Sequence, residues 1–514
     1  MSDPKRKEIF ILGLCLLIGF ALRFYTFDQK SLWMDEIYTF NDSRDDFKAQ
    51  FSYYKQNPTY LQPPLFFILT PLLYPFTNPE RDLRVIPLVF GVLSIPLMYF
   101  LAKSFTPNIA IPCTFSLTFM VYHISLSQDA RSYTFLMFFG MVGLYFFMSY
   151  LKTLRRKYLI FVALSFTIPF YTHYSVIPFI AFCQLLWFYR IDERDKASRL
   201  YPLSILSGFI LLMSLPWVAF MAFNSKVSIL KTGLVGSEET ASFWNLLYQT
   251  LHDWLPNEPL MVGSGILLIL VPFLSKHKRN GFLLLLLSLL PIGGVYLFCK
   301  LFHVVHFVSS RYFICFLPLF FVSIYFSLDA IEARFQTLRH LKVVFLIFFL
   351  VSNLIMLPFY YRSEKQDYRG LVAYLKGQLH DGDKIVAGNT VYIGIMLHYF
   401  GIYPEGRQYV IPGWKVSENE IENRFFLDYA GNRFTILSSR SHWFKYLADG
   451  GRLWIVADRE NANIIKQKMP SSVLKGYFDG SFFGLKKFPE DGSIYLFLWD
   501  PKSIGEKAID MAID

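Results

Sequence analysis

The sequence predicts a mostly α-helical protein: a bundle of about eleven transmembrane helices, followed by an α/β domain outside the membrane. Three observations lead to this fold class. Hydrophobic residues make up 54% of the 514 positions, and they form repeated runs of about 20 residues, the length that crosses a bilayer. Short basic clusters lie between these runs, so membrane topology explains the formal net charge of +11 better than a nucleic-acid partner does. From about Arg362 the apolar runs shorten, and helix-like segments alternate with strand-like ones.

The first apolar run follows a basic cluster and lacks a small-residue cleavage site, so it predicts an uncleaved helix rather than a signal peptide. The predicted spans are 9–27, 85–104, 107–127, 132–151, 157–172, 174–190, 201–222, 260–275, 281–300, 311–328 and 341–361. The proline-rich run Pro64–Phe76 is too short to span, which predicts an interfacial or re-entrant segment.

The distribution of Lys and Arg supports this count, because treating Pro64–Phe76 as a span would invert every later loop. With the predicted count, the inner side holds Lys5/Arg6/Lys7, Lys103, Lys152/Arg155/Arg156/Lys157, Arg190/Arg194/Lys196/Arg199, Lys276/Lys278/Arg279 and Arg334/Arg339/Lys342. The outer side holds 28–84, 128–131, 172–175, 223–259, 301–311 and the C-terminal region. The polar motifs therefore collect on one side of the membrane.

Two domains are predicted: residues 1–361, a membrane domain with 28–84 as its outer loop of interfacial helices, and residues 362–514, a soluble extracytoplasmic α/β domain. In the second domain the pattern predicts a helix over 367–379 and strands over 384–388, 451–458 and 493–499.

Two adjacent acids follow the first predicted span. The stretch SLWMDEIYTF (31–40) places Asp35 and Glu36 just after a tryptophan, where charges at a membrane face are costly unless they are solvated or used. A hydrated loop end would explain them without any function. The functional interpretation is that Asp35 accepts a proton from an acceptor hydroxyl, as a general base does.

A second polar stretch, QDARSY (128–133), lies at the outer end of the third predicted span. Asp129 could orient a substrate or hold a metal, and the planar donor fork of Arg131 suits a phosphate. The alternative is a local surface pair between the two, which contributes little energy and needs no function.

Two further stretches, YTHYS (171–175) and SSRYF (309–313), lie at outward helix ends. The side chains that could line one cavity with the acids are Tyr133, His173, Tyr174, Arg311 and Tyr312. For His173, a place in an interfacial aromatic belt is an equal alternative. The guanidinium of Arg311 suits a phosphate or diphosphate leaving group.

Metal ligands are sparse in the sequence. His303 and His306 could share a helix face, but an i, i+3 pair without a carboxylate is weak evidence. The five cysteines, none with metal-type spacing, are Cys15, Cys113, Cys183, Cys299 and Cys315. Because they lie in or at the ends of apolar segments, we expect neither disulfides nor zinc fingers.

The motifs resemble a known family when they are taken in order. They are Arg23, LWMDEIYT, LQPPLFF, ERDLRVIP, SQDARSYTF and SSRYFICFLP. This series resembles the GT-C glycosyltransferases of the protein mannosyltransferase and aminoarabinose transferase type, from the N-terminus to about residue 375, where KQDYRGLVAYL is similar to the start of their outer domain.

The resemblance implies a polyprenyl-phosphate-sugar donor, an inverting displacement and a catalytic acid in the first outer loop. On this sequence Asp35 is then the base, Glu36 its neighbour, and Asp129 with Arg131 the second motif. Family members often have His-Pro-Pro where this chain has Gln62, Pro63 and Pro64. The missing histidine leaves open whether a divalent metal takes part, and no other cofactor is implied.

The sequence therefore favours an integral membrane glycosyltransferase that acts on the outer face, with a lipid, protein or glycan acceptor, in a bacterial inner membrane. The rival class is a transporter or lipid flippase, which also has many helices and a few intramembrane charges. Against it, no matching broken helices occur in two halves, and the charges gather at one face. A non-catalytic scaffold is a third alternative, which the retained acids and arginine disfavour.

Overall fold

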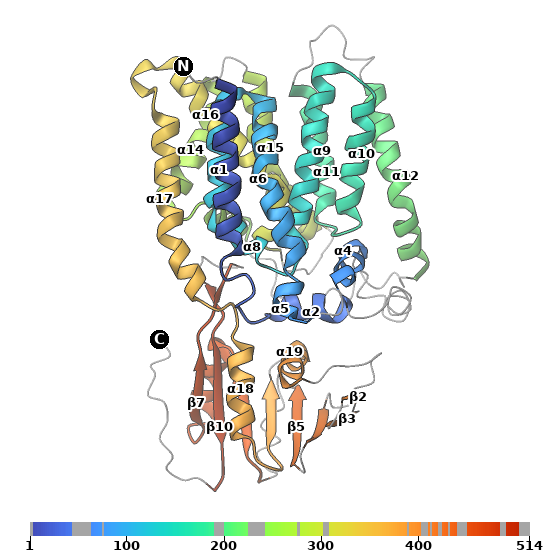
Figure 1. The fold of residues 1–514 in the computed structure, drawn as a ribbon, viewed down its shortest axis with the longest axis vertical. Coiled ribbons are helices and arrows are strands. Elements are labelled where there is room, and N and C mark those ends of the chain that lie inside the picture. Colours follow the sequence, from blue (N-terminus) through green and yellow to red (C-terminus); the bar gives the residue numbers. More distant parts are fainter. Residues whose placement is uncertain are drawn as a thin grey trace. The chain divides into compact units, whose positions relative to one another are not determined.

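The computed structural model describes residues 4–43, 63–73, 77–189, 200–224, 242–274, 278–301, 308–387, 390–401, 410–411, 414–419, 424–429, 432–438, 450–483 and 490–502. The chain forms two compact units (Figure 1). The helical unit comprises Met1–Phe27, Asp46–Tyr360 and Phe483–Phe488. The sheet unit comprises Asp28–Asp45, Tyr361–Phe482 and Pro489–Asp514.

The helical unit consists of α-helices and short 3₁₀ helices. They are α1 (Pro4–Phe24), α4 (Leu65–Leu69), η2 (Thr70–Leu73), α5 (Pro79–Asp82), α6 (Val85–Phe105), η3 (Pro107–Ile109), α7 (Ala110–Phe119), α8 (Val121–Ser127), α9 (Tyr133–Thr153), α10 (Lys157–Phe170), α11 (Val176–Cys183), η4 (Gln184–Tyr189), α12 (Leu200–Asn224), α13 (Phe243–Trp254), α14 (Glu258–Leu274), α15 (Lys278–Leu301), η7 (Ser310–Phe316), α16 (Leu317–Arg334), η8 (Gln336–Leu338) and α17 (Leu341–Arg362). Each predicted span coincides with one to three of these helices. The run at Pro64–Phe76 forms only the short helices α4 and η2 in its described part.

The chain is a multi-pass membrane protein. Among the described residues, 6 helices are long and apolar enough to cross a membrane, or 7 if the bent pair Pro107–Phe119 and Val121–Ser127 is one span. The span Ser310–Arg334 is central, because 83% of its apolar window is buried within the protein. The spans Pro202–Phe223 and Gln336–Arg362 are only 22% buried, so most of their apolar side chains are left for lipid.

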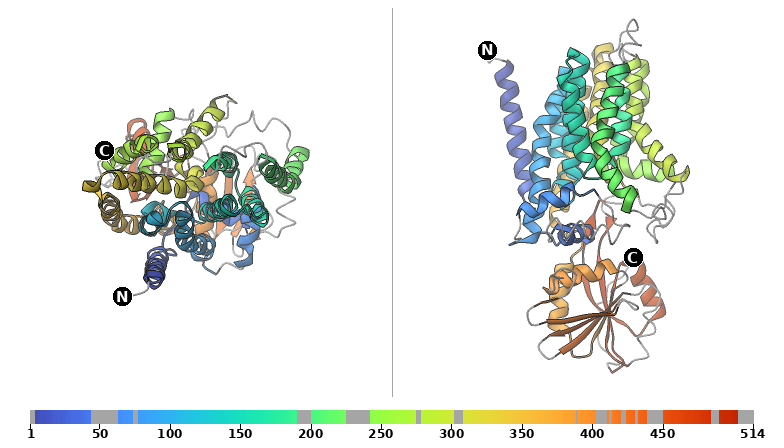
Figure 2. Two further views of the ribbon diagram at one scale, coloured as in Figure 1. Left: turned by 90° about the horizontal axis from the view of Figure 1, so that it is seen from above. Right: turned by 90° about the vertical axis from the view of Figure 1, so that its right-hand side faces the viewer.

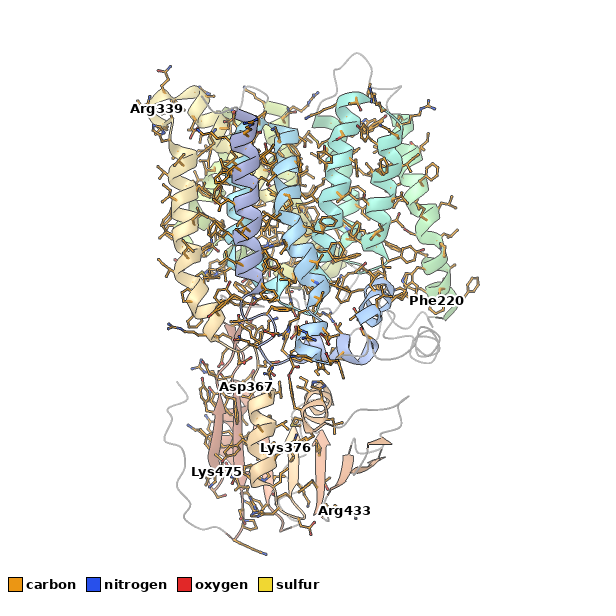
Figure 3. The ribbon with its side chains drawn as sticks, in the orientation of Figure 1. Phe220, Arg339, Asp367, Lys376, Arg433 and Lys475 are labelled. Atoms are coloured by element: carbon orange, nitrogen blue, oxygen red, sulfur yellow. The ribbon has the colours of Figure 1, made fainter. Side chains whose placement is uncertain are left out.

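The basic connections of the helical unit gather at one end of the bundle. The N-terminus, the connection between α9 and α10, and Arg339 all lie at this end (Figures 1 and 3). Lys103 near the end of α6 pairs there with Glu8 of α1 at 2.8 Å. The turn between α8 and α9 lies at the opposite end (Figure 1). This arrangement agrees with the positive-inside pattern of the sequence.

The helix pair α7 and α8 is bent by 59° at Met120, and polar side chains from two other helices satisfy its ends. The guanidinium of Arg23 donates to the carbonyls of Leu117 (2.8 Å) and Thr118 (3.0 Å), in the last turn of α7. The side-chain oxygen of Asn353 accepts from the N–H of Val121 at 2.9 Å, the first residue of α8. A helix end buried in a membrane requires such partners, since water cannot supply them.

We expect Arg23→Met to lower the free energy of unfolding by at least about 3 kcal/mol, because it leaves two carbonyls of α7 buried without their charged donor. Arg23 is 0% exposed, so solvent cannot replace it. Thermal unfolding of the full chain in detergent measures the effect. Arg155→Met, in the exposed connection between α9 and α10, is the control. Equal melting temperatures for the two variants would contradict the capping role.

The sheet unit contains α2 (Met34–Ser43), α18 (Tyr368–Gln378), α19 (Thr390–Phe400), α20 (Arg459–Lys468) and ten strands. The strands are β1 (Lys384–Ala387), β2 (Val410–Ile411), β3 (Trp414–Asn419), β4 (Arg424–Tyr429), β5 (Asn432–Ser438), β6 (Leu453–Ala457), β7 (Val473–Phe478), β8 (Ser481–Phe482), β9 (Glu490–Asp491) and β10 (Ile494–Trp499). The predicted helix and the three predicted strands appear as α18, β1, β6 and β10.

The main sheet has the strand order β2-β3-β4-β5-β1-β6-β10-β7. Strand β1 is parallel to β5 and β6, and the other neighbours are antiparallel (Figure 2). Alternate residues of β6 face opposite sides: Leu453 and Ile455 pack with α20, whereas the Trp454 ring contacts Tyr374 of α18. The central strands are apolar on both faces because both faces are covered.

Asp383 gives the sheet unit a pH-dependent stability. Burial raises the pKa of its carboxyl to about 6, although the Trp454 indole N–H donates to it at 2.9 Å. From about pH 4 to 6 the folded form keeps a proton that the unfolded chain loses, so stability falls by about 2 kcal/mol as pH rises. We expect Asp383→Asn to flatten this decline, measured by hydrogen exchange of β1 and β6 in the full chain. An unchanged slope would contradict this.

Candidate functional site

The turn at Gln128 to Ser132 connects α8 to α9, and its neighbours fix its position. Gly91 of α6 lies against Ser127, the last residue of α8, where an added Cβ would be 2.2 Å from the hydroxyl. The Gln128 amide donates to the carbonyls of Arg23 (2.9 Å) and Tyr25 (2.6 Å), which lie at the end of α1. The side-chain oxygen of Gln128, Oε1, accepts from the Tyr360 hydroxyl at 2.9 Å. The turn is thus tied to both α1 and α17.

This turn carries Asp129 and Arg131. Its backbone is tight, with the N–H of Arg131 donating to the carbonyl of Asp129 at 2.6 Å. Asp129 is buried, with 3% of its surface exposed, whereas Arg131 is half-buried. A carboxylate so enclosed differs from the exposed surface pair that was the alternative interpretation.

Four predicted cavity residues meet in one cluster of the helical unit, which we call the Arg311 cluster: Tyr133, His173, Arg311 and Tyr312. The Arg311 guanidinium carbon lies 5.5 Å from the centre of the Tyr133 ring. The ring centre of His173 is 6.1 Å from that of Tyr133 and 5.2 Å from that of Tyr312. These residues come from α9, η7 and the turn after α10, so the fold brings together segments that are far apart in sequence.

Tyr174 points to a different neighbour. Its hydroxyl accepts from the indole N–H of Trp217 at 2.9 Å and donates to the sulfur of Met221 at 2.7 Å, both on α12. These contacts make Tyr174 a packing residue between the 171–175 turn and α12. Phe220, labelled in Figure 3, lies on the same stretch of α12 and stacks on Trp217 at 5.2 Å.

Asp253 on α13 is a buried carboxylate that the sequence motifs did not indicate. Only 3% of its surface is exposed, and its Oδ2 accepts from the hydroxyl of Ser310 at 2.5 Å. Ser310 also accepts from the Tyr122 hydroxyl at 3.0 Å and directly precedes Arg311. A signal existed, because Leu246, Thr250 and Asp253 share one face of the helix.

Asp35 and Glu36 lie in the first turn of α2, in the sheet unit. Asp35 is half-buried, whereas Glu36 is 0% exposed. The Glu36 carboxylate folds back and accepts from the N–H of Trp33 at 3.3 Å, as the third-position acid of a capping box does. The two adjacent acids therefore lie in different surroundings, and the less buried of them is the predicted base.

No protein-family model matches this chain, and no curated protein matches it in sequence. Among solved structures it is similar to ArnT from Cupriavidus metallidurans in the apo state, at a TM-score of 0.53 and 9% identity, over 97% of this chain and 98% of ArnT. The chain has the fold of ArnT. The predicted GT-C fold of the aminoarabinose transferase type is thereby confirmed.

Two further structures are similar to a lesser degree. ArnT from Cupriavidus metallidurans bound to undecaprenyl phosphate has a TM-score of 0.48 and 10% identity, over 98% of this chain and 100% of that one. Arabinofuranosyltransferase AftD from Mycobacteria has a TM-score of 0.43 and 12% identity, over 76% of this chain and 30% of AftD.

Within this ArnT fold, the described residues contain no group of three or more His, Cys, Asp or Glu that could hold a metal ion. Gln62, His303 and His306 lie outside the described residues. The described side chains offer acid–base and electrostatic chemistry: carboxylates on α2 and after α8, and a guanidinium over an aromatic ring.

Proposed function

We propose that this chain is a glycosyltransferase that moves a hexose or pentose from a polyprenyl-phosphate donor to an acceptor hydroxyl, on the outer face of the membrane. The Arg311 cluster carries the proposal. A buried guanidinium stacked on a tyrosine, at the end of the bundle away from the basic connections, suits the phosphate of a lipid carrier. The ArnT structure with undecaprenyl phosphate makes this carrier the first one to test.

In the proposed reaction Asp35 takes the proton of the acceptor hydroxyl while the acceptor oxygen bonds to the anomeric carbon of the sugar. The bond from that carbon to the phosphate oxygen breaks, and the polyprenyl phosphate leaves with its electrons. Arg131 and Arg311 stabilise the negative charge that develops on the leaving phosphate. Attack opposite the leaving group inverts the anomeric centre, with an oxocarbenium-like centre between base and phosphate.

Asp129 is proposed to orient the substrate beside Arg131, and Glu36 to hold the first turn of α2. His173 and Tyr312 would line the sugar-phosphate site together with Tyr133. The proposed acceptor is a lipid, a protein or a glycan.

The experiment is a transfer assay on the full chain in membranes, with a panel of undecaprenyl-phosphate hexoses and pentoses, together with mass spectrometry of lipids that co-purify with the protein. Transfer from one of these donors is expected. A membrane-impermeant maleimide should label Asp35→Cys and Arg131→Cys from the same side. Labelling from opposite sides would contradict the mechanism.

Many transporters bind their substrate or ion at a discontinuous helix, so such a helix would support the transporter alternative. The bent pair α7 and α8 is a discontinuous helix. However, Arg23 and Asn353 occupy the helix ends at this break, where a transporter would bind its substrate or ion. The break therefore serves the packing of the bundle. Movement of a lipid-linked sugar across vesicles without transfer to an acceptor would favour the transporter instead.

A further inference from the structure

Residues 31–34 lead into α2 and include its first residue, Met34. Side chains from elsewhere in the sheet unit hold this segment. Three backbone N–H groups of this segment donate to side-chain oxygens that come from residues more than 300 positions away. The pairs are Ser31 with Glu364 (2.8 Å), Leu32 with Tyr399 (2.6 Å) and Met34 with Gln366 (3.3 Å). Helix N-termini leave such N–H groups without intrahelical partners, so these side chains fix where α2 begins.

The side chains of the same segment are also enclosed within the sheet unit. Trp33 is 4% exposed, with the Lys365 ammonium 5.5 Å from its ring centre and the Phe482 ring 5.6 Å away. Further along α2, the Phe40 ring meets His398 of α19 at 4.6 Å. Ile37, one turn before it on the same face, is 2% exposed. One face of α2 is therefore packed over its whole length.

The backbone of Lys365 is fixed in turn by two glycines. A Cβ added to Gly480 would lie 2.5 Å from the Lys365 carbonyl oxygen, and one added to Gly492 would lie 2.2 Å from it. No side chain larger than hydrogen fits at either position. The connection between β7 and β8, which holds Gly480, and the connection between β9 and β10, which holds Gly492, therefore lie directly against Lys365. Its neighbours Glu364 and Gln366 supply side chains that hold the start of α2.

Asp35 lies in the first turn of this anchored helix and is half-buried, whereas Glu36 beside it is fully enclosed. We infer that the sheet unit positions the Asp35 carboxylate, with Glu364, Gln366 and Tyr399 as positioning residues that act through the backbone of residues 31–34. This inference rests on the proposed function, in which Asp35 is the base. A displacement of about 1 Å in a reacting group can cost up to about 100-fold in rate.

Tyr399→Phe tests the inference, since it removes the oxygen that holds Leu32 and keeps the ring. Tyr477→Phe is the matched control: its hydroxyl bonds to Asp479 and Ser493, both at 3.1 Å, in the same unit, and these partners belong to the β7–β8 and β9–β10 connections rather than to residues 31–34. With the undecaprenyl-phosphate sugar that the wild type transfers, we expect Tyr399→Phe to lower kcat by about 10-fold or more and change the donor KM by less than about twofold. The control should retain wild-type kcat.

Hydrogen exchange of the full chain provides a readout that needs no substrate. The amides of residues 31–36 should exchange faster in Tyr399→Phe than in the wild type. In Tyr477→Phe they should exchange at the wild-type rate. Gln366 supplies a second pair of variants, because Gln366→Glu keeps the oxygen that accepts from Met34 and Gln366→Met lacks it. We expect Gln366→Glu to preserve kcat and Gln366→Met to lower it.

The outcomes separate the two proposals. Wild-type exchange and kcat in both Tyr399→Phe and Gln366→Met would overturn the positioning role, as would faster exchange with unchanged kcat. If Asp35→Asn retains full transfer while the wild type is active, the assignment of the base fails instead. If the wild type transfers no sugar from any donor, the proposed function fails, and the exchange data still decide whether these side chains hold α2.

Discussion

We expect Asp35→Asn to lower the rate of the proposed sugar transfer by about 10² to 10⁴-fold, the range that a positioned general base contributes. The carboxamide has nearly the size of the carboxylate and fits the first turn of α2, but it cannot accept the proton of the acceptor hydroxyl. The measurement is kcat in membranes supplied with the undecaprenyl-phosphate sugar that the wild type uses. Because the donor site is untouched, binding of undecaprenyl phosphate should stay within about twofold of wild type.

Asp458→Asn is the matched control. It makes the same chemical change at the N-cap of α20, where the Asp458 carboxylate accepts from the N–H of Asn461 at 2.8 Å, and asparagine caps helices equally well. Full transfer by Asp35→Asn would remove the base from the mechanism. If wild type and Asp35→Asn move lipid-linked sugar across the membrane at the same rate, the protein is a transporter. If the protein neither moves the sugar nor transfers it to an acceptor, it is a scaffold.

The spans could be predicted from the sequence because runs of apolar residues report burial in lipid directly. The break at Met120 could not, since the run 107–127 contains no Asp, Glu, Lys or Arg and neither glycine nor proline lies at the break. What allows the helix to end there is tertiary: Arg23 on α1 and Asn353 on α17 supply the hydrogen bonds that the bend removes. Neither partner is local, so periodicity contains no signal for it.

The candidate site divides in the same way. Tyr133, His173, Arg311 and Tyr312 could be grouped from their places at outward helix ends, and the fold brings them together. Asp253 was missed because no charged residue or recognisable motif adjoins it, although it shares a helix face with Leu246 and Thr250, and the structure shows it buried against Ser310.

Several residues of the recognisable motifs hold backbone in this fold. Gln128 binds the carbonyls at the end of α1, and Arg84 donates to the carbonyl of Phe27 at 3.0 Å. Asp82 accepts from the N–H of Asn78 at 3.0 Å and from the Arg81 side chain at 2.8 Å. In these cases a catalytic or binding role assigned from the motif alone would overlook a structural role. Sequence spacing does not show which polar side chain caps a helix or turn.

Arg311→Gln lowers transfer by about 10² to 10³-fold, equivalent to about 3 to 4 kcal/mol of transition-state stabilisation, if its guanidinium takes the charge of the leaving phosphate. Arg311 is 7% exposed, its Nε donates to the Ser309 hydroxyl at 3.3 Å, and its guanidinium carbon lies 5.5 Å from the centre of the Tyr133 ring. Undecaprenyl phosphate, the proposed leaving group, should also bind more weakly. Arg339→Gln, at the exposed basic end of the bundle, is the control.

Arg311→Lys separates charge from geometry. Lysine keeps the positive charge but lacks the planar fork and cannot stack on Tyr133 in the same way. A loss of about 10-fold or more in Arg311→Lys, between wild type and Arg311→Gln, would show that the oriented fork contributes beyond its charge. If Arg311→Gln keeps wild-type transfer and wild-type binding of undecaprenyl phosphate, the Arg311 cluster contributes packing only and does not bind the phosphate. The phosphate site would then have to be built around Arg131, since the turn after α8 holds the other arginine that the mechanism uses.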